Sequence, residues 1–127
     1  MLFRSLPLPP DVDVRNVAAQ SQDAESVLSY YRRALRLRRE MPALNSGAQE
    51  PVEPGDPDVV AYVRRTEGQA ALILLNFASR PAAVRVPAAA AGGTWRVSLS
   101  THPRGPDEAL GGSATLAPLE ALIAAQA

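Results

Sequence analysis

The stretch AALILLNF (residues 70–77) begins with six consecutive apolar residues and shows no alternation of apolar with polar side chains. A strand of this composition is typically buried on both faces, whereas a half-exposed strand alternates. The turn residues TEGQ (66–69) precede it and join it to another apolar run, VVAYVR (59–64). These features predict a β-hairpin whose second strand lies at the centre of a sheet.

Short apolar runs separated by Gly, Pro, Ser and Asn continue to the C-terminus. In TWRVSLS (94–100), Trp95, Val97 and Leu99 alternate with polar residues, so we expect Trp95 in the core rather than on a sugar-binding surface. Residues 45–127 therefore predict a mainly β protein, an antiparallel β-sandwich. Its expected strands are residues 59–64, 70–77, 83–86, 94–100, 115–116 and 119–124.

One amphipathic α-helix is expected ahead of this β-domain, in residues 23–44. Asp23 is a suitable N-cap, and Pro42 should end the helix at or just before Met41. Residues 1–22 are rich in proline and then polar, which predicts an extended N-terminal arm. Because AALILL needs cover on both faces, the helix is the expected cover for one of them.

The helical stretch YYRRALRLRREMPAL (30–44) carries five arginines in eight positions. At 100° per residue, four of them lie on one side and the apolar residues on the other, which is typical of a solvated face behind a core face. Arg38 falls on the apolar side instead. We therefore expect Arg38 to be partly buried and paired with a carboxylate or a carbonyl. The other four are Arg32, Arg33, Arg36 and Arg39.

Composition excludes several classes of protein. The 13 basic residues, all arginine, balance the 13 acidic ones, and a dedicated nucleic-acid-binding domain is usually clearly basic. The absence of cysteine excludes disulfides, a thiolate nucleophile and a Cys-based zinc site. No apolar run has the ~18 residues of a membrane span, and MLFRSLPLPP is a poor signal peptide, so a cytoplasmic protein is expected.

No catalytic, cofactor-binding or metal-binding residue is predicted. The acids lie mainly in loop 50–58, at Asp107–Glu108 and in the arm, and none follows an apolar strand as a scaffolded catalytic carboxylate would. The acidic loop lacks the oxygen spacing of a calcium site. His102 is the sole histidine and is expected in a surface loop. The glycine pairs 92–93 and 111–112 are expected to be turns.

Several phrases occur in the same order in one enzyme family. The phrases are LPLPP (6–10), NVAAQ (16–20), SVLSYYRRALRLRREMPAL (26–44), VVAYVRR (59–65), LILLNFAS (72–79) and LAPLEALI (116–123). Together, from about Leu6 to Ala124, they resemble the end of the catalytic barrel and the C-terminal β-domain of alpha-glucosidases and oligo-1,6-glucosidases of glycoside hydrolase family 13.

The resemblance implies that residues 23–44 correspond to the last barrel helix and residues 45–127 to an alpha-amylase-type C-terminal domain. The three catalytic carboxylates of the family lie upstream of the matched region and have no counterpart here. The resemblance therefore implies a chain without a barrel, whether a truncated gene product, an expressed fragment or a stand-alone domain, and without enzyme activity of its own.

The expected function is a non-catalytic one, structural or partner-binding. A carbohydrate-binding module is the alternative, and a nucleic-acid or regulatory protein that uses the arginine face is a third. In the leading interpretation, the apolar side of helix 24–41 would pack against the catalytic barrel in a complete enzyme. Because the barrel is missing here, we expect that side to pair with a second copy of the chain in a homodimer. A catalytic barrel chain or a carbohydrate are the other expected partners, and neither nucleic acid nor a membrane is.

Overall fold

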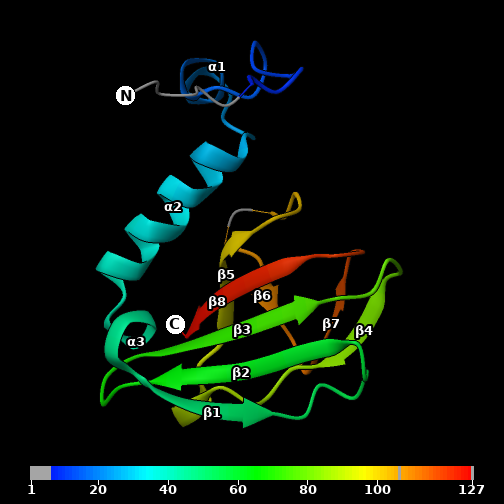
Figure 1. The fold of residues 1–127 in the computed structure, drawn as a ribbon. Helices are drawn as coiled ribbons and strands as arrows, with labels where there is room; N and C mark the ends of the chain where they lie inside the picture. The colour runs from blue at the N-terminus through cyan, green and yellow to red at the C-terminus, as the bar shows by residue number, and fades with distance from the viewer. Residues whose placement is uncertain (1–6, 106, 127) are drawn as a thin grey trace. The chain divides into compact units, whose positions relative to one another are not determined.

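The computed structural model describes residues 7–105 and 107–126 of the chain. The chain divides into two compact units, residues 1–35 and residues 36–127. In chain order (Figure 1), the helices are α1 (Val17–Gln22), α2 (Val27–Glu40), α3 (Pro42–Ser46) and the short 3-10 helix η1 (Ala90–Gly92). The strands are β1 (Ala48–Val52), β2 (Val59–Arg65), β3 (Ala70–Asn76), β4 (Ala82–Arg85), β5 (Trp95–Ser100), β6 (Ala109–Leu110), β7 (Ser113–Leu116) and β8 (Ala121–Gln126).

The first unit differs locally from the sequence prediction. Part of the arm that was expected to be extended forms α1, which begins where the Asn16 side chain accepts a hydrogen bond from the Ala19 amide at 2.8 Å. The start of α2 is capped by Ser26, whose Oγ accepts from the Ser29 amide at 3.2 Å. Asp23 was the wrong N-cap, because it lies four residues before the first helical residue.

Pro42 ends α2 as predicted, since the last residue of that helix is Glu40. The same proline then occupies the first turn of α3, where its missing N–H costs nothing. The short helix stops at Gly47, and a Cβ at that position would collide with the Ala43 carbonyl oxygen. The chain can therefore turn directly from α3 into the first strand only with glycine at this point.

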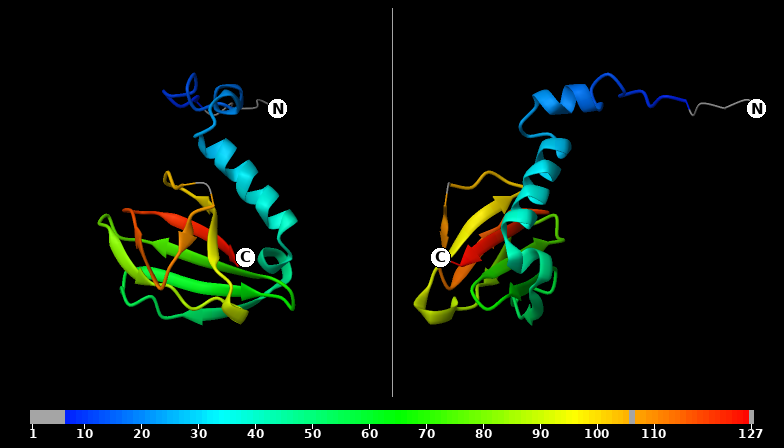
Figure 2. Two further views of the ribbon diagram at one scale, coloured as in Figure 1. Left: turned by 180° about the vertical axis from the view of Figure 1, so that it is seen from behind. Right: turned by 90° about the vertical axis from the view of Figure 1, so that its left-hand side faces the viewer.

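The larger sheet has six strands in the order β1-β2-β3-β8-β5-β6, and the pairs are antiparallel. Figures 1 and 2 show the C-terminal strand β8 between β3 and β5. The predicted hairpin is present, because β2 pairs with β3 and the Thr66 amide donates to the Gln69 carbonyl at 2.9 Å. Strand β3, the stretch AALILLN, is central in this sheet as predicted.

The second sheet consists of β4 and β7, and the main core lies between the two sheets. Its largest fully buried side chains include Trp95 and Leu72 from the large sheet and Leu116 from the small one. This arrangement is the predicted antiparallel β-sandwich, and Trp95, only 2% exposed, is in its core as predicted.

The other face of β3 is covered in part by a smaller cluster. Met41 and Ala43 are buried there together with Ala71 and Ile73. The cover for AALILL therefore comes from the end of the segment predicted as one helix, where Pro42 divides it into α2 and α3. Half-buried side chains surround this cluster, including Tyr62.

Two strands and one change of face were not predicted. Strand β1 lies in the stretch expected to be a loop and pairs with β2, and the two-residue strand β6 pairs with β5. The predicted alternation of Trp95, Val97 and Leu99 is wrong at its last member. An irregularity between Val97 and Leu99 places Val97 opposite Ala124 but Leu99 opposite Ile123, so these two side chains lie on opposite faces.

We predict that Trp95→Ala destabilises the protein by about 3–5 kcal/mol, because it removes the largest buried side chain of the core and leaves a cavity. Urea unfolding followed by circular dichroism would measure the loss. The wild-type protein should show the blue-shifted tryptophan emission of a buried indole. A fully water-exposed emission maximum would contradict the placement of Trp95.

Candidate functional site

The most elaborate polar cluster of the molecule is built around Glu120, which immediately precedes β8 and is 1% exposed. Its Oε1 accepts hydrogen bonds from Ser100 Oγ and from Arg104 Nε, both at 2.7 Å. Its Oε2 accepts from the Ala117 amide at 2.7 Å and from a terminal nitrogen of Arg104 at 2.9 Å. Both carboxylate oxygens are therefore fully engaged inside the protein.

Arg104 extends the cluster to two further segments. One terminal nitrogen donates to Glu108 at 2.8 Å, and the other donates to the Thr115 carbonyl in β7 at 2.7 Å. The Arg104 side chain is 14% exposed, so its charge is held mostly inside the protein by two carboxylates. These contacts tie the loop after β5 to the beginning of β8 and to the second sheet.

The electrostatics of this cluster do not fit a general acid. Burial by itself raises the pKa of Glu120, but the hydrogen bonds from Arg104, Ser100 and the Ala117 amide outweigh it and place that pKa below its ordinary value of 4.5. A catalytic acid of a glycosidase needs a raised pKa and access to the substrate. Glu120 has neither, so its chemistry is that of a structural ion pair.

A second buried polar side chain, Asn76, lies at the end of β3. Its amide nitrogen donates to the Arg80 and Ala117 carbonyls, both at 2.9 Å, and its oxygen accepts from the Ala78 amide at 2.9 Å. The Asn76 backbone amide donates to the Glu120 carbonyl at 2.9 Å. Asn76 and Glu120 therefore hold the same corner of the sandwich.

The predicted acidic loop contains an ion-pair cluster in which Asp58 and Arg80 are half-exposed and Asp56 is mostly covered. Arg80 donates to both oxygens of Asp56, at 2.9 and 3.1 Å, and to Asp58 at 2.8 Å. The hydrogen bonds from Arg80 and from the Asp58 amide hold the pKa of Asp56 below its ordinary value. Each of these acids already has a cationic partner, so the loop offers no free set of carboxylates to a cation.

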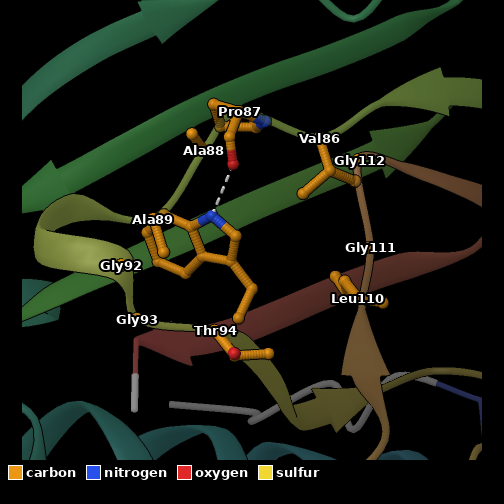
Figure 3. Close-up of a pocket in the computed structure, with 11 residues that line it drawn as sticks. Val86, Pro87, Ala88, Ala89, Gly92, Gly93, Thr94, Leu110, Gly111 and Gly112 are labelled. Carbon is orange, nitrogen blue, oxygen red and sulfur yellow. Dashed lines mark hydrogen bonds between the residues drawn. The ribbon is translucent and has the colours of Figure 1, made fainter.

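A pocket of about 380 Å³ lies beside Trp95 (Figure 3). Three stretches of the chain line it, residues 86–89, 92–95 and 110–112. Trp95 Nε1 donates to the Pro87 carbonyl at 2.7 Å, the dashed line of the figure. The indole is thus part of the pocket floor and almost wholly buried, and its ring has no free face on which a sugar could stack.

Of the remaining sequence candidates, His102 lies beside the Glu120 cluster, because its backbone amide donates to Ser100 Oγ at 3.0 Å and it lines a pocket together with Arg104 and Glu120. His102 is in the turn after β5, half-buried, with Nδ1 3.3 Å from Thr101 Oγ1. Arg38 was expected to be partly buried and paired, and this prediction is wrong. Its side chain is exposed, and in residues 7–105 and 107–126 no hydrogen bond or ion pair holds it. Across the same residues, no three His, Asp or Glu side chains gather where they could bind a metal ion.

The buried pair Arg104 and Glu120 was missed by the sequence reasoning, although one signal pointed to it. Glu120 is the only charged residue in LAPLEALIA (116–124), and a charge inside an apolar strand run must be paired when it is buried. Its partner could not be identified in the same way, because Arg104 lies 16 residues earlier in an irregular loop.

The part of the chain that contains Arg104 and Glu120 also matches a known protein family. The family described as "Maltogenic Amylase, C-terminal domain" matches residues 49–123, more than half of the chain. The chain belongs to this family. The match covers β2 to β7 completely and includes every buried residue of the sandwich core except Ala124, together with Asn76, Arg104 and Glu120.

Similar curated proteins are glycosidases of family 13. The trehalose-6-phosphate hydrolase of Bacillus subtilis (strain 168) is 29% identical over 85% of this chain and 19% of its own length. The probable oligo-1,6-glucosidase 3 of the same organism is 34% identical over 55% of this chain and 13% of its own length. The resemblance to family 13 that the sequence phrases suggested is therefore confirmed.

A solved structure agrees with the sequence comparison. The trehalulose synthase MutB of Pseudomonas mesoacidophila MX-45 superposes on 96% of this chain with a TM-score of 0.81 and 28% identity. The match takes up 22% of the MutB chain. This chain thus corresponds to the C-terminal domain of the family, and it spans about a fifth or less of the relatives named here.

Helices α1, α2 and α3 belong to the described residues, and none of the helices there is both long and apolar enough to cross a membrane.

We predict that Glu120→Gln destabilises the protein by about 3 kcal/mol, because the mutation leaves the mostly buried Arg104 without its main counter-charge. Urea unfolding at pH 7 would measure the loss. Asp58→Asn, which weakens a pair with Arg80 in which both side chains are half-exposed, is the matched control and should change stability little. Equal losses in the two variants would contradict a special role for the buried pair.

The wild-type protein should also lose stability in acid. Because the pKa of Glu120 is lower in the folded state, the unfolded chain takes up this proton first as the pH falls. The contribution of Glu120 is fully present above about pH 4.5 and is lost as the pH falls toward the folded-state pKa. In Glu120→Gln this part of the pH dependence should be absent from urea unfolding curves.

Proposed function

We propose that the chain is a non-catalytic C-terminal β-domain whose role is structural, namely to support a family 13 catalytic module. The observation that carries the proposal is the small fraction of each relative's length that this chain matches. The chain accounts for 13–22% of relatives whose names denote hydrolases, glucosidases and a synthase, and the matching part is their C-terminal domain.

The arrangement of the carboxylates supports this role. Glycoside hydrolysis needs two carboxyl groups at the substrate, one of them able to donate a proton. Here Glu108 and Glu120 are joined through Arg104, and Asp56 and Asp58 through Arg80. Each pair is bridged by a guanidinium, and in each pair the hydrogen bonds to one acid, Glu120 or Asp56, lower the pKa of that acid.

We predict that the pure chain does not hydrolyse aryl alpha-glucosides. The assay would compare release of the aryl group with a buffer blank, and with the Glu108→Gln and Glu120→Gln variants. Hydrolysis above the blank that disappears on mutation of one of these acids would overturn the proposal.

The apolar side of α2 supports a second part of the proposal, self-association when no catalytic module is present. Val27, Tyr31 and Leu35 are each more than half exposed, and their spacing of four residues places them in one stripe along the helix. A stripe of this kind pairs well with a copy of itself about a two-fold axis. The chain has no net charge, so two copies do not repel each other at long range.

We therefore predict that the chain forms a homodimer through α2, the helix that the sequence predicts at residues 24–41. Sedimentation velocity at micromolar concentration should show a species of twice 13.5 kDa. Leu35→Glu should convert it to monomer, whereas Arg36→Glu on the arginine side should not. A monomer in the wild type that Leu35→Glu leaves unchanged would refute this mode of association.

A further inference from the structure

Strand β8 has a central place in the large sheet, between β3 and β5 (Figure 1). It is hydrogen-bonded to β3 along one side and to β5 along the other. Its side chains Leu122 and Ala124 are fully buried in the sandwich core. In the part of the chain that the structure describes, β8 is joined to the other strands only through residues 117–120, which connect it to β7.

This connection is a strained turn. The Glu120 amide donates to the Ala117 carbonyl at 3.1 Å, which closes a β-turn with Pro118 and Leu119 at its two central positions. Leu119 has a φ of +57°, and a type II turn needs such a positive φ at this position, where glycine or asparagine is usual. The leucine therefore adopts the left-handed conformation at an energetic cost. Its side chain is 63% exposed, so burial offsets little of that cost.

The contacts of β8 can be made without this turn when two copies of the chain exchange the strand. In that arrangement residues 117–120 run on in an extended conformation, and β8 of each copy enters the sheet of the other between β3 and β5. The ladder and core contacts of β8 are re-formed with the second copy, so the two arrangements differ mainly in the conformation of the connection. Short connections under strain favour exchange, because exchange releases the strain.

The buried ion pair determines when exchange takes place. Glu120 immediately precedes β8, so withdrawing the strand from a folded domain would also take Glu120 away from Arg104. The Arg104 side chain is only 14% exposed and would be left without its main counter-charge. A folded domain with β8 withdrawn is therefore unfavourable, and the choice between the β8 of the same copy and that of another copy is made while the chains fold.

We propose that the chain has two closed folded forms, a monomer and a dimer in which two copies exchange β8, and that the strained turn at Leu119 sets the balance between them. The partner is a second copy of the chain, and the contact lies within the large sheet. The exchange is therefore independent of the association through α2. A dimer of this kind persists on dilution, because its separation requires β8 to leave a sheet in which it is paired on both sides.

The test uses single cysteines in the full chain, which has no cysteine of its own. Every chain also carries Leu35→Glu, so that the stripe on α2 does not contribute. One chain has a tag and Leu75→Cys in β3, and the other has no tag and Ala121→Cys in β8. A disulfide between them forms when β8 of the second chain lies in the sheet of the first, because residues 75 and 121 are opposite each other in the β3–β8 ladder.

The geometry of this position suits a disulfide. The adjacent residues Asn76 and Glu120 are joined by a backbone hydrogen bond, so Leu75 and Ala121 form the closer, non-hydrogen-bonded kind of antiparallel pair. The Cα atoms of such a pair are about 4.5 Å apart, within the range that a disulfide spans. Both side chains are half-buried, so neither cysteine removes a fully buried core residue.

The two chains are unfolded together in urea, refolded at millimolar or at micromolar concentration, and oxidised only after refolding. We expect a disulfide-linked heterodimer on a non-reducing gel after refolding at millimolar concentration and much less of it after refolding at micromolar concentration. A tagged chain with Ala83→Cys, at an exposed position of β4, replaces the Leu75→Cys chain as the control for random collisions between thiols. A heterodimer no more abundant than in this control would overturn the exchange.

The role of the turn is tested with Leu119→Gly in both chains. Glycine adopts the positive φ without strain, so the yield of heterodimer should fall roughly fivefold or more. Ala91→Gly is the matched control, because it relieves a φ of +53° in η1, outside the turn, and should leave the yield unchanged. Equal yields with Leu119→Gly and with the native turn would overturn the proposal.

A measurement without cysteines guards against variants that fold poorly. The Leu35→Glu chain alone is refolded at the same two concentrations, diluted, and examined by sedimentation velocity. We expect a dimer that persists after refolding at millimolar concentration and a monomer after refolding at micromolar concentration. A monomer after both treatments would overturn the exchange, whether or not the cysteine variants fold.

Discussion

The sandwich depends on one buried carboxylate. Glu120 is held by a side chain from β5, by the guanidinium of Arg104 and by a backbone amide that follows β7, and Arg104 in turn binds a β7 carbonyl. A buried charge is tolerated only when it is fully paired, so these segments must meet in one arrangement for the chain to fold. Asn76 fixes the neighbouring strand end to the same corner. The two phrases that suggested the family, LILLNFAS and LAPLEALI, each contribute one of these two residues.

The sandwich and its central strand could be predicted because they depend on local patterns. AALILL is apolar on both faces, TEGQ has turn composition, and Pro42 cannot continue a helix. The same is true of the core position of Trp95, which alternates with polar neighbours. The buried, paired state of Glu120 could have been predicted in the same way, because Glu120 is the lone acid in an apolar run.

What could not be predicted depends on partners distant in sequence. Strand β1 contains Pro51 and a glutamate and has poor strand propensity, but it is an edge strand and needs only β2 as its neighbour. The irregularity between Val97 and Leu99 depends on the register with β8, which no pattern within β5 reveals. Arg38 was assigned a buried partner from helical periodicity alone. Periodicity identifies a side of a helix, but it does not show that this side is covered.

The distribution of charge and apolar surface explains why this domain would act through its surfaces. In an enzyme site, carboxylates are exposed in a cleft with pKa values adjusted for proton transfer. Here the most deeply buried carboxylate is neutralised by an arginine, and the acids of the loop at Asp56 and Asp58 are bridged by another. From the start of α2 onward, the large apolar side chains that remain exposed in the described residues lie on α2 and in the β-domain; they are Val27, Tyr31, Leu35, Val60, Phe77 and Leu119. Polar groups therefore stabilise the fold, and apolar groups are what the domain offers to a partner.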